Sequence, residues 1–416
     1  MPATAQKTSV AARFLRYVTF DTQSSEKSDT SPTTAKQLVL ADQLVKELKE
    51  LGIQDAARNE FGIVFATIPA TSKKNVPVIG LVSHVDTSPE SSGAGVKPIV
   101  HTAWRGEDIV LPDDPSIVLR AADHPELKRQ IGNDIITASG TTLLGADDKA
   151  GVAEIMAATE YLLRHPEIAH GPIRIGFTPD EEVGRGTDKF DIQVFGAKYA
   201  YTMDGEVRGT MDVETFSADS MVVEFRGFNT HPGFAKGKMI NSIRVAADFL
   251  SRVPRDRMSP ETTEKREGFV HPYMVDSSVD RTAVKFIIRD FRTGELKKME
   301  DMLERLAQET VAAWPGAKVS VKVQESYRNL GDVLAQHPAV VDNAREAYRR
   351  SGLEPIEAAI RGGTDGSRLS AIGLPTPNLF TGMQNFHSKQ EWVSVQDMEK
   401  AVEVIVNLVR VWEERA

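Results

Sequence analysis

The stretch IRIGFTPDEEVGRG, residues 173–186, begins as an apolar strand and ends in three consecutive carboxylates, Asp180, Glu181 and Glu182. Like charges at neighbouring positions repel one another, so a cation, a proton or open solvent has to offset the repulsion. In open α/β sheets, ligands bind beyond the carboxyl ends of the strands. The stretch therefore predicts a sheet with acidic side chains at the ends of its strands.

Strand and helix patterns alternate on both sides of this stretch. Residues 76–87, VPVIGLVSHVDT, form a continuous apolar run of the kind found in strands buried on both faces. Small and apolar residues recur at i+3 and i+4 spacing in residues 142–165, which is typical of a helix. A further helical period covers residues 34–51, and strand patterns cover residues 61–70 and 195–206. This order predicts an α/β fold with a mixed sheet of partly parallel character.

The pattern changes after about residue 212. Alternating strands and amphipathic helices then follow the order β-α-β-β-α-β, which is typical of a compact α+β, ferredoxin-like domain. Helical patterns resume in residues 339–352 and 395–414. We therefore predict a discontinuous first domain, residues 1–212 and 327–416, interrupted by an inserted domain at residues 213–326.

The composition excludes several classes of function. The chain has 416 residues, no cysteine and a formal net charge of -9, with 41% hydrophobic and 26% charged residues. Disulfides, thiolate catalysis and cysteine metal sites are excluded, so any metal must be held by His, Asp and Glu. The acidic balance argues against nucleic acid or an anionic membrane as the main partner. No apolar run approaches the ~20 residues of a membrane span.

The beginning of the chain bears on its location. Residues 1–20 are basic and free of acids but lack the apolar core of a signal peptide. A transit peptide would share this composition, whereas residues 10–18, VAARFLRYV, also fit a first amphipathic helix. We favour the helix and predict a cytoplasmic protein.

Histidines and acids gather after the predicted strands. His84 and Asp86 are separated by one residue in an extended segment, so the carboxylate could orient the imidazole. The same pair would also fit a surface turn. Asp204 closes another strand pattern, and His387 lies in a loop with aromatic neighbours, where a packed histidine is the commoner case.

The acid pairs have more than one interpretation. Asp147 and Asp148 lie in a short loop that opens the helix within residues 142–165, where caps and the helix dipole also favour acids. Glu181 and Glu182 diverge because they are adjacent, so one could bind a metal while the other faces a bound water, or both could lie in a solvated turn. Asp180 has no role that we can assign and is expected to be solvated.

The separate structural explanations for these residues become less convincing when the residues are considered as a set. Two histidines and several carboxylates after strand ends can supply one site for two divalent ions with a bridging aspartate. Such ions polarise a carbonyl and lower the pKa of bound water toward ~7.

Seven motifs, in this order, resemble those of the M20 metallopeptidases. They are SHVDTSP (83–89), TLLGADDKAGVAEIM (142–156), TPDEEVGRG (178–186), TMDGE (202–206), NTHPGFAKGKMIN (229–241), RGGTDGSRLS (361–370) and PTPNLFTGMQNFHSKQEW (375–392). The resemblance runs from residue 16 onward. One local departure is Met383, where a second glycine would be expected; it leaves every presumed ligand in place.

The resemblance implies roles for the residues at the strand ends. It implies His84 and Asp204 on one metal, Glu182 and His387 on the other, and Asp147 bridging both. Asp86 would orient His84. Glu181 would be the general base, which takes a proton from a metal-bridging water and delivers it to the leaving amine.

The resemblance also implies a lid or dimerisation role for the inserted domain. His231 would stabilise the developing oxyanion, although it could instead be a turn histidine before Pro232. Weaker candidates would hold the backbone or the terminal carboxylate of the substrate, because an arginine fork suits a carboxylate. These candidates are Asn241, Arg289 and Arg361, and Arg289 could instead pair with Asp290 or Glu295.

The implied activity is release of the N-terminal residue from tripeptides. Zinc is the favoured metal, and cobalt or manganese would accept the same ligands. A homodimer and a short peptide substrate are expected. The alternatives are a dipeptidase, a carboxypeptidase or an N-acyl amino acid deacylase on the same scaffold and, more remotely, a non-catalytic peptide-binding protein. An iron oxygenase with two histidines and one carboxylate would leave Asp147 and Asp204 without a role.

Overall fold

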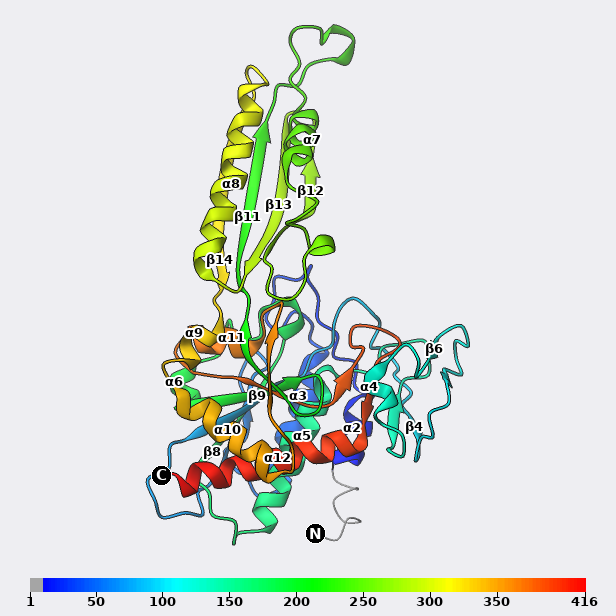
Figure 1. Cartoon of the computed structure of the whole chain (residues 1–416), viewed down its shortest axis with the longest axis vertical. Coiled ribbons are helices and arrows are strands. Elements are labelled where there is room, and N and C mark those ends of the chain that lie inside the picture. The colour runs from blue at the N-terminus through cyan, green and yellow to red at the C-terminus, as the bar shows by residue number, and fades with distance from the viewer. Residues whose placement is uncertain (1–9) are drawn as a thin grey trace. The chain divides into compact units, whose positions relative to one another are not determined.

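The computed structural model describes residues 10–416, and the chain divides into two compact units (Figure 1). The first unit comprises the described residues up to Val213 together with Val333–Ala358 and Thr364–Ala416. The second comprises Glu214–Asp332 and the short segment Ala359–Gly363. The second unit thus extends beyond residue 326 and includes a distant segment that no local sequence pattern indicates.

An eight-stranded mixed sheet forms the centre of the first unit, with strand order β1-β2-β8-β3-β9-β16-β10-β15. Strands β8, β3, β9 and β16 run parallel to their neighbours in this series, whereas β1, β2 and β10 pair antiparallel. The predicted α/β class with a mixed sheet is confirmed. The strands are β1 (Ala57–Arg58), β2 (Val64–Ile68), β3 (Ile79–His84), β8 (Ile173–Thr178), β9 (Tyr199–Gly205), β10 (Thr210–Thr215), β15 (Ile356–Ile360) and β16 (Asn378–Phe380).

Helices pack on this sheet because every residue of β3 is buried and needs apolar cover on both faces. Helix α5 packs on β3 and β9 and also contacts α2 and α12. Val82 of β3 packs with Phe195 of α6 and Leu369 of α11. The helices are α2 (Val10–Tyr17), α3 (Gln37–Glu50), α4 (Pro125–Lys128), α5 (Ala146–Arg164), α6 (Ile192–Phe195), α9 (Leu330–Leu334), α10 (Pro338–Arg350), α11 (Asp365–Ala371) and α12 (Val395–Glu414).

A smaller antiparallel sheet, β17-β18-β7-β4, also belongs to the first unit. Its strands are β4 (Ile99–His101), β7 (Ile135–Thr137), β17 (Met383–Gln384) and β18 (Trp392–Ser394), and β5 (Ile109–Val110) and β6 (Val118–Leu119) form a separate pair. The loop between β17 and β18 carries His387, so the pairing of Gln384 with Trp392 fixes both ends of that loop.

The second unit has the element order β-α-β-β-α-β and an antiparallel sheet, β12-β13-β11-β14. Alternate residues of β11 and β13, such as Val223 and Phe286, join Phe249 of α7 and Leu303 of α8 in one apolar core. Both helices therefore cover the same face of the sheet. The elements are β11 (Ser217–Arg226), α7 (Ser242–Arg252), β12 (Phe269–Ser277), β13 (Arg281–Asp290), α8 (Thr293–Ala312) and β14 (Lys318–Tyr327). Among the helices of the described residues, none is long and apolar enough to cross a bilayer.

Candidate metal centre

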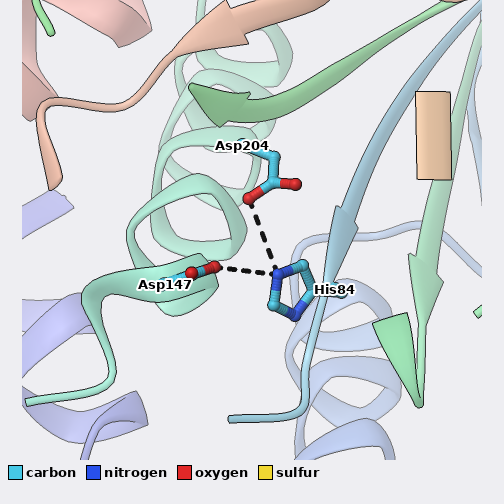
Figure 2. Close-up of side chains that lie close together, drawn as sticks. All are labelled: His84, Asp147 and Asp204. Atoms are coloured by element: carbon cyan, nitrogen blue, oxygen red, sulfur yellow. Dashed lines mark hydrogen bonds and ion pairs between the residues drawn. The ribbon is translucent and has the colours of Figure 1, made fainter. Parts of the chain in front are cut away.

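Three side chains from separate elements meet at the carboxyl ends of the parallel strands. His84 is the last residue of β3, Asp204 lies near the end of β9, and Asp147 is at the start of α5. Figure 2 shows the two carboxylates directed at the imidazole. His84 Nε2 lies 2.9 Å from Asp147 Oδ1 and 3.6 Å from Asp204 Oδ1. These three residues form one ligand group, and all their donor atoms lie within 4.8 Å of one another.

A second ligand group uses the other oxygen of the same aspartate. Asp147 Oδ2 lies 3.3 Å from His387 Nε2, and Glu182 Oε2 lies 2.7 Å from that nitrogen. These atoms also lie within 4.8 Å of one another. Asp147 is therefore shared by the two groups, and the pairings are those that the sequence resemblance implied.

Asp86 contacts one residue of each ligand group, His84 and Glu182. This side chain is completely buried, and its Oδ1 lies 3.3 Å from His84 Nδ1. The two oxygens of Asp86 also accept the backbone N–H groups of Glu181 at 3.0 Å and of Glu182 at 3.2 Å. Asp86 therefore contacts the ring of His84 and holds the 3₁₀ turn Glu181–Val183 that presents both glutamates.

The electrostatics of the cluster show a need for positive charge. Burial raises the pKa of Glu182 to about 8 and that of Asp204 to about 6, with Asp147 adding to both. Burial alone would lower the pKa of the two histidines, but the surrounding carboxylates outweigh it and raise that of His387 to about 11 and that of His84 well above its ordinary value. Without a cation, protonated histidines would offset these carboxylates, and a divalent cation in the cluster would supply that positive charge instead.

The donor set fits divalent cations. It consists only of imidazole nitrogens and carboxylate oxygens, which zinc accepts. Burial would raise the pKa of Asp147, but His387 and His84 outweigh it and lower the pKa, so this carboxylate stays ionised between two ligand groups. Glu182 Oε1 is buried without a hydrogen-bond partner, which leaves it available as a ligand.

Glu181 has a different environment from Glu182. Its side chain is partly exposed, and it belongs to neither ligand group. Burial raises the pKa of Glu181 well above its ordinary value; His84 lowers it, while Asp204, Asp365 and Glu182 raise it further. A raised pKa makes the carboxylate of Glu181 a stronger base than an ordinary glutamate.

The prediction that Asp180 is solvated is wrong. Its side chain is 1% exposed and accepts hydrogen bonds from the Thr33 backbone N–H and from the side chains of Thr33 and Gln37. The residue has a positive φ of 58°, and its carboxylate contacts Thr33 and Gln37 instead of the two ligand groups. Asp180 therefore anchors the acidic turn to Thr33 and to Gln37, the first residue of α3.

Two further acids contact the candidate ligands, and no separate sequence signal predicted a contact for either of them. Asp148 is completely buried and accepts hydrogen bonds from the Ser83 hydroxyl and from the His84 backbone N–H at 3.1 Å. Its backbone is not helical, so it is not an ordinary first-turn acid. Glu90 Oε2 lies 3.2 Å from His387 Nδ1 and faces the second imidazole. Proximity of this kind arises only from the fold.

The predicted oxyanion and substrate residues all belong to the second unit. His231 is exposed, and its Nδ1 accepts the Gly233 backbone N–H at 3.1 Å. Asn241 caps α7 through the Ile243 N–H at 2.9 Å.

Arg289 and Arg361 contact each other within that unit. The guanidinium of Arg361 donates to the carbonyl groups of Thr263, Lys265 and Glu267 and lies over the ring of Phe216. Arg289 donates to the Arg361 carbonyl at 3.3 Å, and its Nε is buried without a hydrogen-bond partner. Neither Asp290 nor Glu295 forms an ion pair with Arg289, since both face other basic residues.

Two imidazoles and three carboxylates, one of them shared, form two candidate metal-ligand groups at the strand ends of an α/β sheet. The sequence model of the peptidase family M20/M25/M40 matches residues 132–411. The chain belongs to this family and is a peptide hydrolase.

Similar relatives extend over nearly the full chain. A peptidase T of Geobacillus sp. (strain WCH70) is 45% identical over 99% of this chain and 100% of the relative. A peptidase T of Desulfitobacterium hafniense (strain Y51) is 48% identical over 98% of both chains.

Solved structures show the same fold. The aminopeptidase PepT from Bacillus cereus ATCC 10987 has a TM-score of 0.75 at 22% identity and covers 98% of both chains. A tripeptidase from Staphylococcus aureus has the same TM-score and identity, over 98% of this chain and 99% of that one. A dinuclear metal-binding M20 peptidase from Bacillus subtilis has a TM-score of 0.67 at 16% identity.

Proposed function

We propose that this chain is a di-metal aminopeptidase that releases the N-terminal residue from tripeptides. The observation that carries the proposal is the position of Asp147, which offers one carboxylate oxygen to each of two ligand groups. The full-length relatives named peptidase T, at 45% and 48% identity, support tripeptides as substrates.

The ligand roles follow from the two groups. His84 and Asp204 would hold one ion, Glu182 and His387 the other, and Asp147 would bridge both. Bound there, two divalent ions, with zinc favoured, would polarise the scissile carbonyl and lower the pKa of a water molecule between them. Asp86 holds the imidazole of His84 and the Glu181–Glu182 turn in a fixed position relative to each other.

Glu181 performs the proton transfers. Glu181 belongs to neither ligand group and directly precedes the ligand Glu182, and burial raises its pKa, which makes its carboxylate a stronger base than an ordinary glutamate. Glu181 accepts the proton of that water as the water attacks the carbonyl carbon. The protonated carboxyl then delivers the proton to the leaving amine as the peptide bond breaks.

His231 is the proposed donor to the developing oxyanion. Because its Nδ1 accepts the Gly233 N–H, a neutral ring carries its proton on Nε2, and this proton is the one an oxyanion would accept. Arg289, with an unpartnered Nε, is a better candidate for a substrate carboxylate than Arg361, whose guanidinium binds three carbonyl groups. Asn241 keeps its amide nitrogen for a substrate backbone, since only its oxygen caps α7.

The test uses protein stripped with a chelator and reloaded with zinc, cobalt or manganese. It is incubated with Met-Gly-Gly, with the N-acetylated peptide, and with the matching di- and tetrapeptides. We expect metal-dependent release of free methionine from the tripeptide and no cleavage of the acetylated form. Preference for the acetylated peptide would indicate a deacylase, and preference for the dipeptide would indicate a dipeptidase. We also expect a cytoplasmic homodimer, which cell fractionation and sedimentation would test.

A further inference from the structure

Glu391 is a buried carboxylate between the two loops that carry ligands. It lies four residues after His387 and directly before β18, and its side chain is 1% exposed. Its Oε2 accepts the backbone N–H groups of Leu144 and Gly145, each at 2.7 Å. Its Oε1 accepts the backbone N–H of Asp147 at 3.0 Å. One carboxylate therefore binds three amides of the segment that ends in the shared ligand.

These hydrogen bonds determine the shape of that segment. Gly145 has a positive φ of 83°, and Asp147 has non-helical backbone angles although it lies at the start of α5. The amides at the start of a helix have no partners within the helix, so a carboxylate placed there satisfies them and the positive end of the helix dipole. Because the third amide belongs to Asp147 itself, Glu391 fixes the backbone from which the ligand side chain projects.

The backbone that carries Glu391 is fixed as well. Trp392, the next residue, pairs with Thr137 of β7 and with Gln384 of β17. The two ends of the His387 loop are thereby held by one small sheet, and Glu391 connects this sheet to the Asp147 segment. The two segments are about 240 residues apart in sequence, so this connection is tertiary.

We propose that Glu391 is a positioning residue for both metal ions, because it holds the shared ligand Asp147 in register with the loop that carries His387. This inference rests on the proposed metal function. Residues that orient metal ligands from outside the ligand set are worth ~10–100-fold in metal affinity. We expect an effect of this size on both ions, since Asp147 belongs to both ligand groups.

The test replaces Glu391 with glutamine, which keeps the shape of the side chain but exchanges one acceptor oxygen for an amide nitrogen. In either orientation of the amide, at least one of the three N–H groups loses its acceptor. The matched control is Asp397→Asn, a buried acid of α12 that contacts Gln130 and Arg208 and belongs to neither ligand group.

Two measurements separate positioning from general stabilisation. Titration calorimetry of the metal-free proteins with zinc and with cobalt gives the affinity and the number of ions bound. Thermal unfolding with and without metal gives the stabilisation that the ions add, which mass action ties to their affinity. We expect Glu391→Gln to bind both ions ~10–100-fold more weakly and to gain less from metal, and Asp397→Asn to match the wild type in both.

Wild-type affinity for both ions in Glu391→Gln would overturn the inference and leave the proposed function intact. An equal loss of affinity in Asp397→Asn would also overturn it, because any buried acid would then have the same effect. If the wild type itself binds no divalent ion, the inference fails together with the proposed function. Should Glu391→Gln not fold, Glu391→Asp, which keeps the charge but shortens the reach, takes its place under the same criteria.

Discussion

The two ligand groups share Asp147 but differ in what surrounds their histidines. His84 ends a fully buried strand, its side chain is 2% exposed, and Asp86, Asp147 and Asp204 all contact its ring. His387 lies in a loop with a positive φ of 60°, and its side chain is 31% exposed. Its outer nitrogen faces Glu90, whose side chain is 69% exposed.

This difference indicates that the candidate centre has two unlike halves: the His84 group is the rigid half, and the His387 group is the adaptable half. The His84 group is fixed by the sheet before any ion binds, so little ordering is required of it. The His387 group depends on a loop that solvent reaches. We therefore expect the ion between Asp147, Glu182 and His387 to dissociate first when a chelator is added, because preorganised ligands lose less entropy on binding. The predictions below test this division.

The largest effect is expected at the residue that the halves share. Asp147→Ala removes one oxygen from each ligand group, so neither half retains its full set. We expect weak or no binding of both ions and hydrolysis at the background rate, measured by metal analysis after dialysis and by a tripeptide assay. If the variant retained two tightly bound ions, Asp147 would not be a bridge.

The next effect is expected at Glu181, which belongs to neither half. Glu181→Gln keeps the volume of the side chain but removes the base, and general acid–base catalysis is worth ~10²–10⁴-fold. We expect the turnover number to fall by this factor while both ions remain bound, because the ligand groups are untouched. Calorimetry beside the tripeptide assay measures both quantities. Loss of an ion in Glu181→Gln would contradict the role of base.

A direct comparison of the halves uses His84→Ala and His387→Ala in metal-free protein. Without His84, the carboxylates of Asp86, Asp147 and Asp204 remain buried with no positive partner on that side, and breaking a buried pair costs about 3–5 kcal/mol. Without His387, water can reach the freed carboxylates through the exposed loop, so a smaller cost is expected.

Thermal unfolding in the presence of a chelator tests this difference. A lower midpoint for His84→Ala than for His387→Ala is the expected order. Equal midpoints would mean that the fold does not distinguish the two halves.

Local pattern was enough to predict the mixed sheet and the acidic side chains at the ends of its strands. The apolar run before His84 and the strand before Asp180 each indicate a buried strand with a polar end, and parallel strands bring such ends to one edge. The resemblance then assigned each of the five ligand positions, and the structure places those five side chains in two adjoining groups.

The supporting residues could not be predicted in the same way. Glu391 is a single acid in SKQEW, and the amides that it binds lie more than 240 residues earlier. Asp148 was one of two adjacent acids that a helix start would also explain, and its partners Ser83 and His84 lie on strand β3. In each case tertiary packing determines the hydrogen-bond partner, and the periodicity of the sequence does not predict it.

The smallest effect on turnover is expected at Asp180. This residue tests whether one carboxylate of the acidic turn only stabilises the structure while its neighbours Glu181 and Glu182 take part in the reaction. In Asp180→Asn the amide would present an N–H to a place where Thr33 and Gln37 already donate, leaving a buried donor unpaired at a cost of about 1–3 kcal/mol. The turnover number and KM should stay within a few-fold of wild type, because this carboxylate belongs to neither ligand group and binds Thr33 and Gln37. Thermal unfolding and steady-state kinetics on the same preparation measure both. A turnover loss as large as that of Glu181→Gln, without loss of stability, would place Asp180 in the reaction itself.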